Sequence, residues 1–175
     1  YAPVTGVFAA MFLAPYAPTM ILAGICMLTS LSLLIKALIA DNFKWRLDGV
    51  GFGLLLLLSL LFVSCLFSFA RIGSLTVWAM YFIFILFYVV IINTVSSKEQ
   101  IYAIIKLFVL SAALVALYGI MQYIFGWTTT NAWIDETMFE DDTMRVYSTM
   151  GNPNVLGEFL LISMPFAAVY FLKYK

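Results

Sequence analysis

The side chains best suited to chemistry lie in one short stretch, from Arg145 to Glu158. Asn is a preferred helix N-cap and Pro fits the first helical position, so Asn152 and Pro153 predict the start of a helix. The first turn of a helix offers unpaired N–H groups and the positive end of the helix dipole. Together with the guanidinium of Arg145, Asn152 and Asn154 therefore predict a binding site for an anion, above all a diphosphate.

Further polar side chains continue into the same predicted helix. Glu158 lies roughly 9 Å below the helix start, at about 1.5 Å per residue, and Asn154 shares its face one turn earlier. A carboxylate at that depth in a membrane is costly unless it faces a wet cavity or a cation. Two interpretations stay open. Glu158 and Gln122 form a polar track into the helix bundle, or Glu158 is an interfacial carboxylate that reaches back to the headgroups.

Arg145 also has a simpler interpretation, because it could offset Asp141 and Asp142 in the preceding acidic segment. The segment 127–152 is long for a connection, and such segments are often functional, although a solvated acidic loop is the better explanation of its carboxylates. No Ser-His-Asp arrangement, metal-ligand cluster or phosphate-cradling glycine loop can be assembled, and the chain has no His. The sequence therefore predicts neither a metal nor a cofactor.

The composition identifies the environment of these residues. Of the 175 residues, 65% are hydrophobic and only 10% are charged, and the mean hydropathy is +1.06. A globular protein in water needs charged residues to cover its surface, whereas a chain solvated by lipid needs apolar side chains outside as well. The sequence therefore predicts an integral membrane protein. The formal net charge of zero gives no electrostatic case for a nucleic-acid partner.

Apolar runs separated by short polar breaks predict an all-α, polytopic transmembrane helix bundle in a single domain, residues 1–175. The first run is short, and the chain begins with Tyr1, so we expect a clipped first helix and a longer natural chain. Arg71 to Gly73 is predicted to be a turn, and Ser97 with Gln100 fits a capping box. The six predicted spans are residues 2–14, 19–38, 50–69, 75–95, 101–125 and 153–173.

Local patterns within the spans add smaller predictions. Gly49, Gly51 and Gly53 superficially resemble a nucleotide-binding loop, but no strand precedes them, so close helix packing is the better interpretation. Pro165 is expected to kink the last span. Cys26 and Cys65 are predicted to be packing residues. A face of small residues for a neighbouring helix is predicted at Ala112, Ala113, Ala116 and Gly119.

The distribution of Lys and Arg predicts the orientation. One side of the predicted topology receives seven of these residues, and the other side receives only Arg71 and Arg145. The basic side of a membrane protein is cytoplasmic, so the connectors 39–49 and 96–100 are predicted to be cytoplasmic and the loop 127–152 extracytoplasmic. The seven residues of the basic side are Lys36, Lys44, Arg46, Lys98, Lys106, Lys173 and Lys175.

The block from Arg145 to Leu160 (R-x-x-S-T-x-G-N-P-N-x-x-G-x-x-L), set after several spans and an outward loop, resembles the O-antigen ligase and polymerase-like family of bacterial membrane glycosyltransferases. The resemblance implies an enzyme of the bacterial cytoplasmic membrane. It takes a glycan from an undecaprenyl-diphosphate carrier and passes it to a lipid, a further repeat unit or a protein in cell-surface polysaccharide assembly. Arg145 matches the family's motif arginine and would contact the carrier diphosphate, without a metal or nucleotide.

The resemblance also implies that part of the enzyme lies elsewhere. The family carries a large outer loop with a functional histidine further along its chain, and the present sequence has no His, so these 175 residues are expected to be inactive alone. Two alternatives stay open for the function. One is a multi-pass transporter or flippase component, because broken helices and intramembrane carboxylates also mark transport pathways. The other is a non-catalytic membrane assembly subunit.

Overall fold

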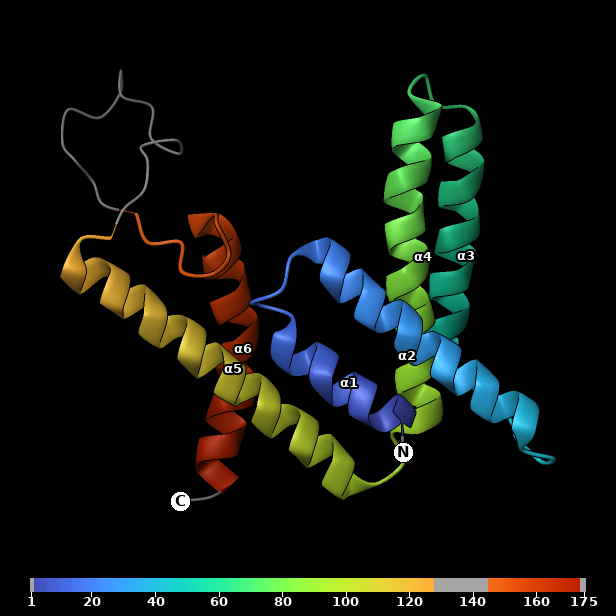
Figure 1. Cartoon of the computed structure of the whole chain (residues 1–175), viewed down its shortest axis with the longest axis horizontal. Helices are drawn as coiled ribbons and strands as arrows, with labels where there is room; N and C mark the ends of the chain where they lie inside the picture. Colours follow the sequence, from blue (N-terminus) through green and yellow to red (C-terminus); the bar gives the residue numbers. More distant parts are fainter. Residues whose placement is uncertain (1, 128–144, 174–175) are drawn as a thin grey trace. The chain divides into compact units, whose positions relative to one another are not determined.

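The structure, a computed structural model, describes residues 2–127 and 145–173 (Figure 1). These residues form helices and connecting segments, with no β-strand among them. The helices confirm the predicted all-α fold. They are α1 (Ala2–Leu13), α2 (Thr19–Ile39), α3 (Gly49–Leu66), α4 (Arg71–Thr94), α5 (Lys98–Phe125) and α6 (Pro153–Lys173).

Five of these helices, α2 to α6, are long and apolar enough to cross a membrane, and α1 is a shorter apolar helix. Large apolar side chains are exposed along all five, for example Leu38 at 78% and Leu161 at 68%. Water cannot solvate so much apolar surface, whereas lipid can, and a helix satisfies its backbone hydrogen bonds internally. The structure therefore supports a membrane protein with transmembrane helices.

The break between α3 and α4 differs from the prediction. Arg71 begins α4 instead of forming a turn, and the chain reverses over residues 67–70. The Phe67 N–H donates to the Ser64 carbonyl, and the Ser74 N–H donates to the Ala70 carbonyl, so the reversal is completed within four residues. The first residue of a helix needs no intrahelical partner for its N–H, which allows Arg71 to take that position.

The described residues divide into two units. Unit 1 comprises the described parts of 1–11 and 17–101, in which α4 packs against both α2 and α3. Figure 1 shows α3 and α4 side by side as a hairpin. The indole N–H of Trp78 on α4 donates to the Leu58 carbonyl of α3 at 3.0 Å, and both predicted packing cysteines are buried.

Two local predictions, the capping box at Ser97 and the close packing of the α3 glycines, fall within unit 1. The capping box is confirmed, because the Ser97 hydroxyl accepts the Gln100 N–H at 3.2 Å and the Gln100 side chain accepts the Ser97 N–H. Of the three glycines at the start of α3, only Gly51 is in close packing. A Cβ there would lie 2.8 Å from a Leu47 methyl group. The prediction is wrong for the other two glycines of α3, which face open space.

Unit 2 comprises residues 12–16 and the described part of 102–175. Aromatic side chains join α5 to α6, because the ring of Phe108 meets Phe159 and Phe166 edge-on at 5.7 and 5.6 Å between centroids. At the C-terminal end of α6, the Lys173 ammonium lies 3.2 Å from the centroid of the Tyr102 ring of α5. These pairs align α5 and α6 in antiparallel directions. Pro165 lies within α6, which continues past it to its end at Lys173.

The short segment 12–16 is fixed to α5 by two reciprocal hydrogen bonds. The Tyr16 hydroxyl donates to the Ser111 carbonyl at 2.8 Å, and the Ser111 hydroxyl donates to the Phe12 carbonyl at 2.9 Å. Ser111 is fully buried. A buried hydroxyl needs such a partner, because its desolvation is otherwise uncompensated.

Candidate anion site at the start of α6

The predicted helix start at Asn152 and Pro153 is confirmed. Pro153 is the first residue of α6, where its missing N–H removes no hydrogen bond. Asn152 acts as the N-cap, because its side-chain oxygen accepts the Asn154 N–H at 2.8 Å and its carbonyl accepts the Leu156 N–H at 3.0 Å. The two asparagines are therefore brought together, and Asn154 itself is exposed.

Ser148 fixes the segment before α6 onto α5. Its N–H donates to the side-chain oxygen of Gln122 at 2.8 Å, and its hydroxyl donates to the Val115 carbonyl at 2.6 Å. Ser148 and Gln122 are only 4% and 3% exposed. The φ of Ser148 is +50°, a left-handed conformation that few residues other than Gly adopt. These two buried hydrogen bonds hold that conformation in place.

Gly119 of α5 allows this close approach. A Cβ at Gly119 would lie 3.2 Å from a methyl group of Val146 and 3.7 Å from the Ser148 Cβ. The prediction of a small face on α5 is therefore confirmed at Gly119, where the neighbour is the segment before α6 together with Leu156 of α6. The same face does not extend to Ala113, which is exposed.

A groove of about 420 Å³ opens beside these contacts, between α5, α6 and the segment that contains Val146. The side chains that line it are apolar, apart from the hydroxyl of Tyr123, so it suits a hydrocarbon chain better than a sugar. Its lining residues are Ala116, Gly119, Ile120, Tyr123, Val146, Leu156 and Leu160.

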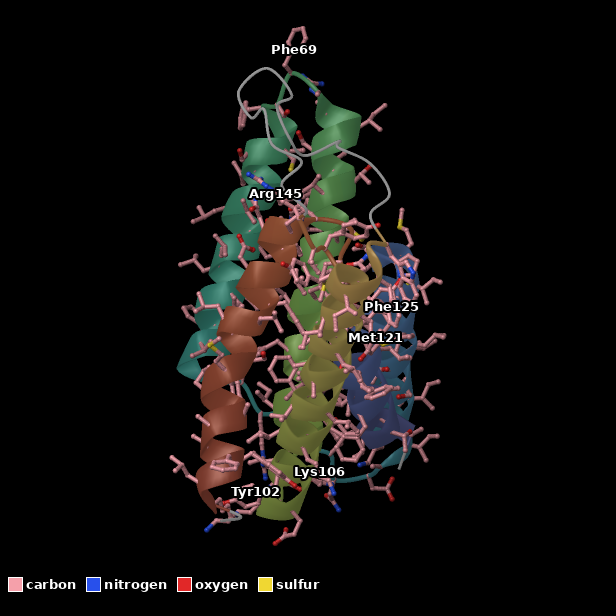
Figure 2. All side chains as sticks on the ribbon, turned by 90° about the vertical axis from the view of Figure 1, so that its left-hand side faces the viewer. Phe69, Tyr102, Lys106, Met121, Phe125 and Arg145 are labelled. Atoms are coloured by element: carbon pink, nitrogen blue, oxygen red, sulfur yellow. The ribbon has the colours of Figure 1, made fainter. Side chains whose placement is uncertain are left out.

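Arg145 precedes this segment and is exposed. Figure 2 shows it near the N-terminal end of α6. Because Ser148 is fixed to α5 and Pro153 begins α6, the backbone that carries Arg145 is held at the same end of unit 2 as the first turn of α6. The alternative interpretation, that Arg145 offsets Asp141 and Asp142, involves two residues outside the described part of the chain. The other acidic residues of that loop also lie outside it.

The remaining predicted site residues are Gln122 on α5 and Glu158 on α6. Gln122 is buried and bound to Ser148, which gives it a structural role in holding the segment. Glu158 is exposed on α6, one turn after the equally exposed Asn154. The polar track through Gln122 and Glu158 stays a prediction.

Sequence reasoning did not single out Ser148 or the Val115 carbonyl. A Ser in a polar loop gives no signal of a positive φ, and a backbone carbonyl has no sequence signature at all. The Ser-Thr pair within the motif was visible as a pattern, but its partner on α5 lies 26 residues earlier. Only the fold reveals that pairing.

No protein-family model, no curated protein and no solved structure matches this chain. The family assignment therefore stays a prediction that rests on the motif from Arg145 to Leu160.

Proposed function

We propose that this chain is part of a membrane glycosyltransferase that takes a glycan from a polyprenyl-diphosphate carrier, resembling the O-antigen ligases and polymerases. The observation that carries the proposal is the fixed segment before α6. Hydrogen bonds from Ser148 to α5 hold Arg145, the first turn of α6 and an apolar groove at one end of unit 2.

Each part of this arrangement suits one part of the carrier. The isoprenoid tail needs an apolar surface and no hydrogen bonds, which the groove between α5 and α6 provides. The diphosphate needs a cation and hydrogen-bond donors. Arg145 is the proposed cation. The first turn of α6 offers the positive end of the helix dipole and the Val155 N–H. Pro153 has no N–H, and the N–H groups of Asn154 and Leu156 already donate to Asn152. The exposed side-chain amide of Asn154, in that turn, is a further donor.

The chemistry requires little more at this end of the substrate. A hydroxyl of the acceptor attacks the anomeric carbon of the glycan and releases its proton to solvent. The bond from that carbon to the diphosphate oxygen breaks, and the oxygen keeps the electron pair. Negative charge therefore grows on the departing diphosphate. A guanidinium held beside it stabilises the transition state more than the ground state, which accelerates the transfer.

The test is Arg145→Ala in the full-length protein, with transfer of the glycan from its lipid carrier to the acceptor as the measurement. Loss of a positioned cation is expected to reduce transfer about 100-fold or more, while membrane insertion and expression stay unchanged. Arg71→Ala, which removes the other predicted outward Arg, is the matched control and should transfer normally. Near-normal transfer by an inserted Arg145→Ala protein would disprove the role of Arg145 at the diphosphate, whereas no transfer by the unaltered full-length protein would disprove the glycosyltransferase itself.

A further inference from the structure

The connector between α2 and α3 has a pattern that the proposed function does not use. Residues 43–48 form no helix or turn, and Asp48 at their end has extended backbone dihedrals. Apolar and charged residues alternate along this connector. The apolar residues are Phe43, Trp45 and Leu47, and the charged residues are Lys44, Arg46 and Asp48. The rings of Phe43 and Trp45 meet edge-on at 5.0 Å between centroids.

Side chains of α4 hold this connector in place. The amide of Asn93 forms two hydrogen bonds with the backbone of Arg46, because its oxygen accepts the Arg46 N–H at 2.7 Å and its nitrogen donates to the Arg46 carbonyl at 2.9 Å. The Asp48 carboxylate accepts the Tyr88 hydroxyl at 2.8 Å and the Gly51 N–H at 2.7 Å. The connector is therefore preorganised, which lowers the entropy lost on binding a ligand.

Trp45 lines a groove of about 280 Å³ between α2 and α4. The other side chains of the groove are apolar except for the hydroxyl of Ser30, which already donates to the Cys26 carbonyl of its own helix at 2.8 Å. The side chains that line the groove therefore favour an apolar ligand over a polar one. An acyl chain fits the groove, because hydrocarbon needs no hydrogen bond and packs against an apolar lining by van der Waals contact.

Two cations neighbour the groove residue Trp45 in the chain. Lys44 and Arg46 flank Trp45 in the sequence, and the side chains of both are exposed. The carboxylate of Asp48, in the same connector, accepts the Gly51 N–H and the Tyr88 hydroxyl. Lys and Arg carry their charge on long flexible stems that reach a headgroup beside an apolar surface. A phosphate headgroup above the groove would therefore be attracted to both.

We propose that the groove between α2 and α4, together with Lys44 and Arg46, is a binding site for one anionic phospholipid. An acyl chain lies against Trp45 in the groove, and the phosphate lies between the two cations. Charge complementarity selects the anionic lipid over a zwitterionic one. The site belongs to unit 1, so it is independent of the glycan-transfer proposal.

The test compares dioleoyl phosphatidylglycerol with dioleoyl phosphatidylcholine, each titrated into the full chain in detergent and counted by native mass spectrometry. Tight binding of a single phosphatidylglycerol is expected, with weaker binding of phosphatidylcholine. In Lys44→Gln/Arg46→Gln, affinity for phosphatidylglycerol should fall about 25-fold, because each cation near a lipid surface contributes about fivefold. Affinity for phosphatidylcholine should not change.

The matched control removes two charges elsewhere, in Arg71→Gln/Lys98→Gln, and should keep the preference for phosphatidylglycerol. Val89→Phe fills the groove and should weaken binding of both lipids equally. A further measurement uses the fluorescence of the groove residue Trp45. Brominated phosphatidylglycerol should quench the Trp fluorescence of the unaltered protein more than that of Trp45→Phe. Equal affinity for the two lipids, an undiminished preference in Lys44→Gln/Arg46→Gln, or equal quenching would each overturn the proposal.

Discussion

At the scale of single residues, buried polar side chains decide where backbone segments lie. Gln122 and Ser148 are both nearly inaccessible, and their hydrogen bond joins α5 to the segment before α6. Removing one partner would leave a buried donor or acceptor unpaired, which costs more than the bond itself contributes. Gln122 therefore acts on the candidate anion site indirectly, because its side chain holds Ser148 and with it the segment that leads into α6.

We expect the ionisation of Asp48 to make the stability of the protein depend on pH in the acid range. Its pKa lies below the ordinary value of 3.8, chiefly because the carboxylate accepts the Gly51 N–H, and secondly because it accepts the Tyr88 hydroxyl. A lowered pKa in the folded state means that the ionised form stabilises the fold above pH 3.8. That stabilisation is lost as the pH falls through the lower, folded-state value.

The measurement is thermal unfolding of the purified protein in detergent from about pH 6 down to about pH 2. Asp48→Asn can still accept the Gly51 N–H but does not titrate, so its stability should decline less over the acid end of this range. Asp41→Asn, an exposed carboxylate of the same connector, should keep the profile of the unaltered protein. Identical acid profiles for Asp48→Asn and the unaltered protein would contradict this prediction.

At the scale of elements, the contact between α5 and the segment before α6 depends on a missing side chain. Gly119→Ala would place a Cβ 3.2 Å from a Val146 methyl group, which is tighter than ordinary van der Waals contact. The Val146 methyl group must then shift by a few tenths of an ångström, and the buried hydrogen bonds of Ser148 oppose that shift because they hold the segment on α5. We expect the free energy of unfolding to fall by about 1–3 kcal/mol, and we expect glycan transfer by the full-length protein to fall with it.

The control for this element lies in the same unit. A Cβ at Gly157 of α6 would meet nothing within 4 Å, so Gly157→Ala should leave stability unchanged or raise it by up to about 1 kcal/mol through helix propensity. Unfolding of both variants in mixed micelles separates packing from propensity. Equal stability of Gly119→Ala and Gly157→Ala would show that the close approach has no energetic role.

At the scale of the whole molecule, the distribution of Lys and Arg predicts which ends face the cytoplasm, and labelling tests it. Thr149→Cys and Lys98→Cys introduce exposed thiols at opposite predicted sides. A membrane-impermeant maleimide should label Thr149→Cys in intact cells and Lys98→Cys only after permeabilisation. The native Cys26 and Cys65 are buried and should react slowly in either case. Labelling of both variants from the same side would overturn the predicted orientation.

The sequence by itself determined the class of the molecule and the order of its helices. Apolar runs of about 20 residues are needed to span a bilayer, and no water is present there to satisfy an exposed backbone, so the pattern leaves helices as the only solution. The start of α6 at Pro153 was also readable, because the Asn152 cap and the proline act within their own turn. Helix ends that depend on turn geometry, such as the start of α4 at Arg71, were less accurate.

Only the tertiary structure decided which polar side chains meet. The side chain of Gln122 accepts the N–H of Ser148, 26 residues later, and the side chain of Asn93 on α4 holds the Arg46 backbone, 47 residues earlier. Such pairs have no periodicity in the sequence, since they form wherever the fold brings a donor to an acceptor. A glycine likewise shows its purpose only when its neighbour is known, which separates Gly51 and Gly119 from Gly53.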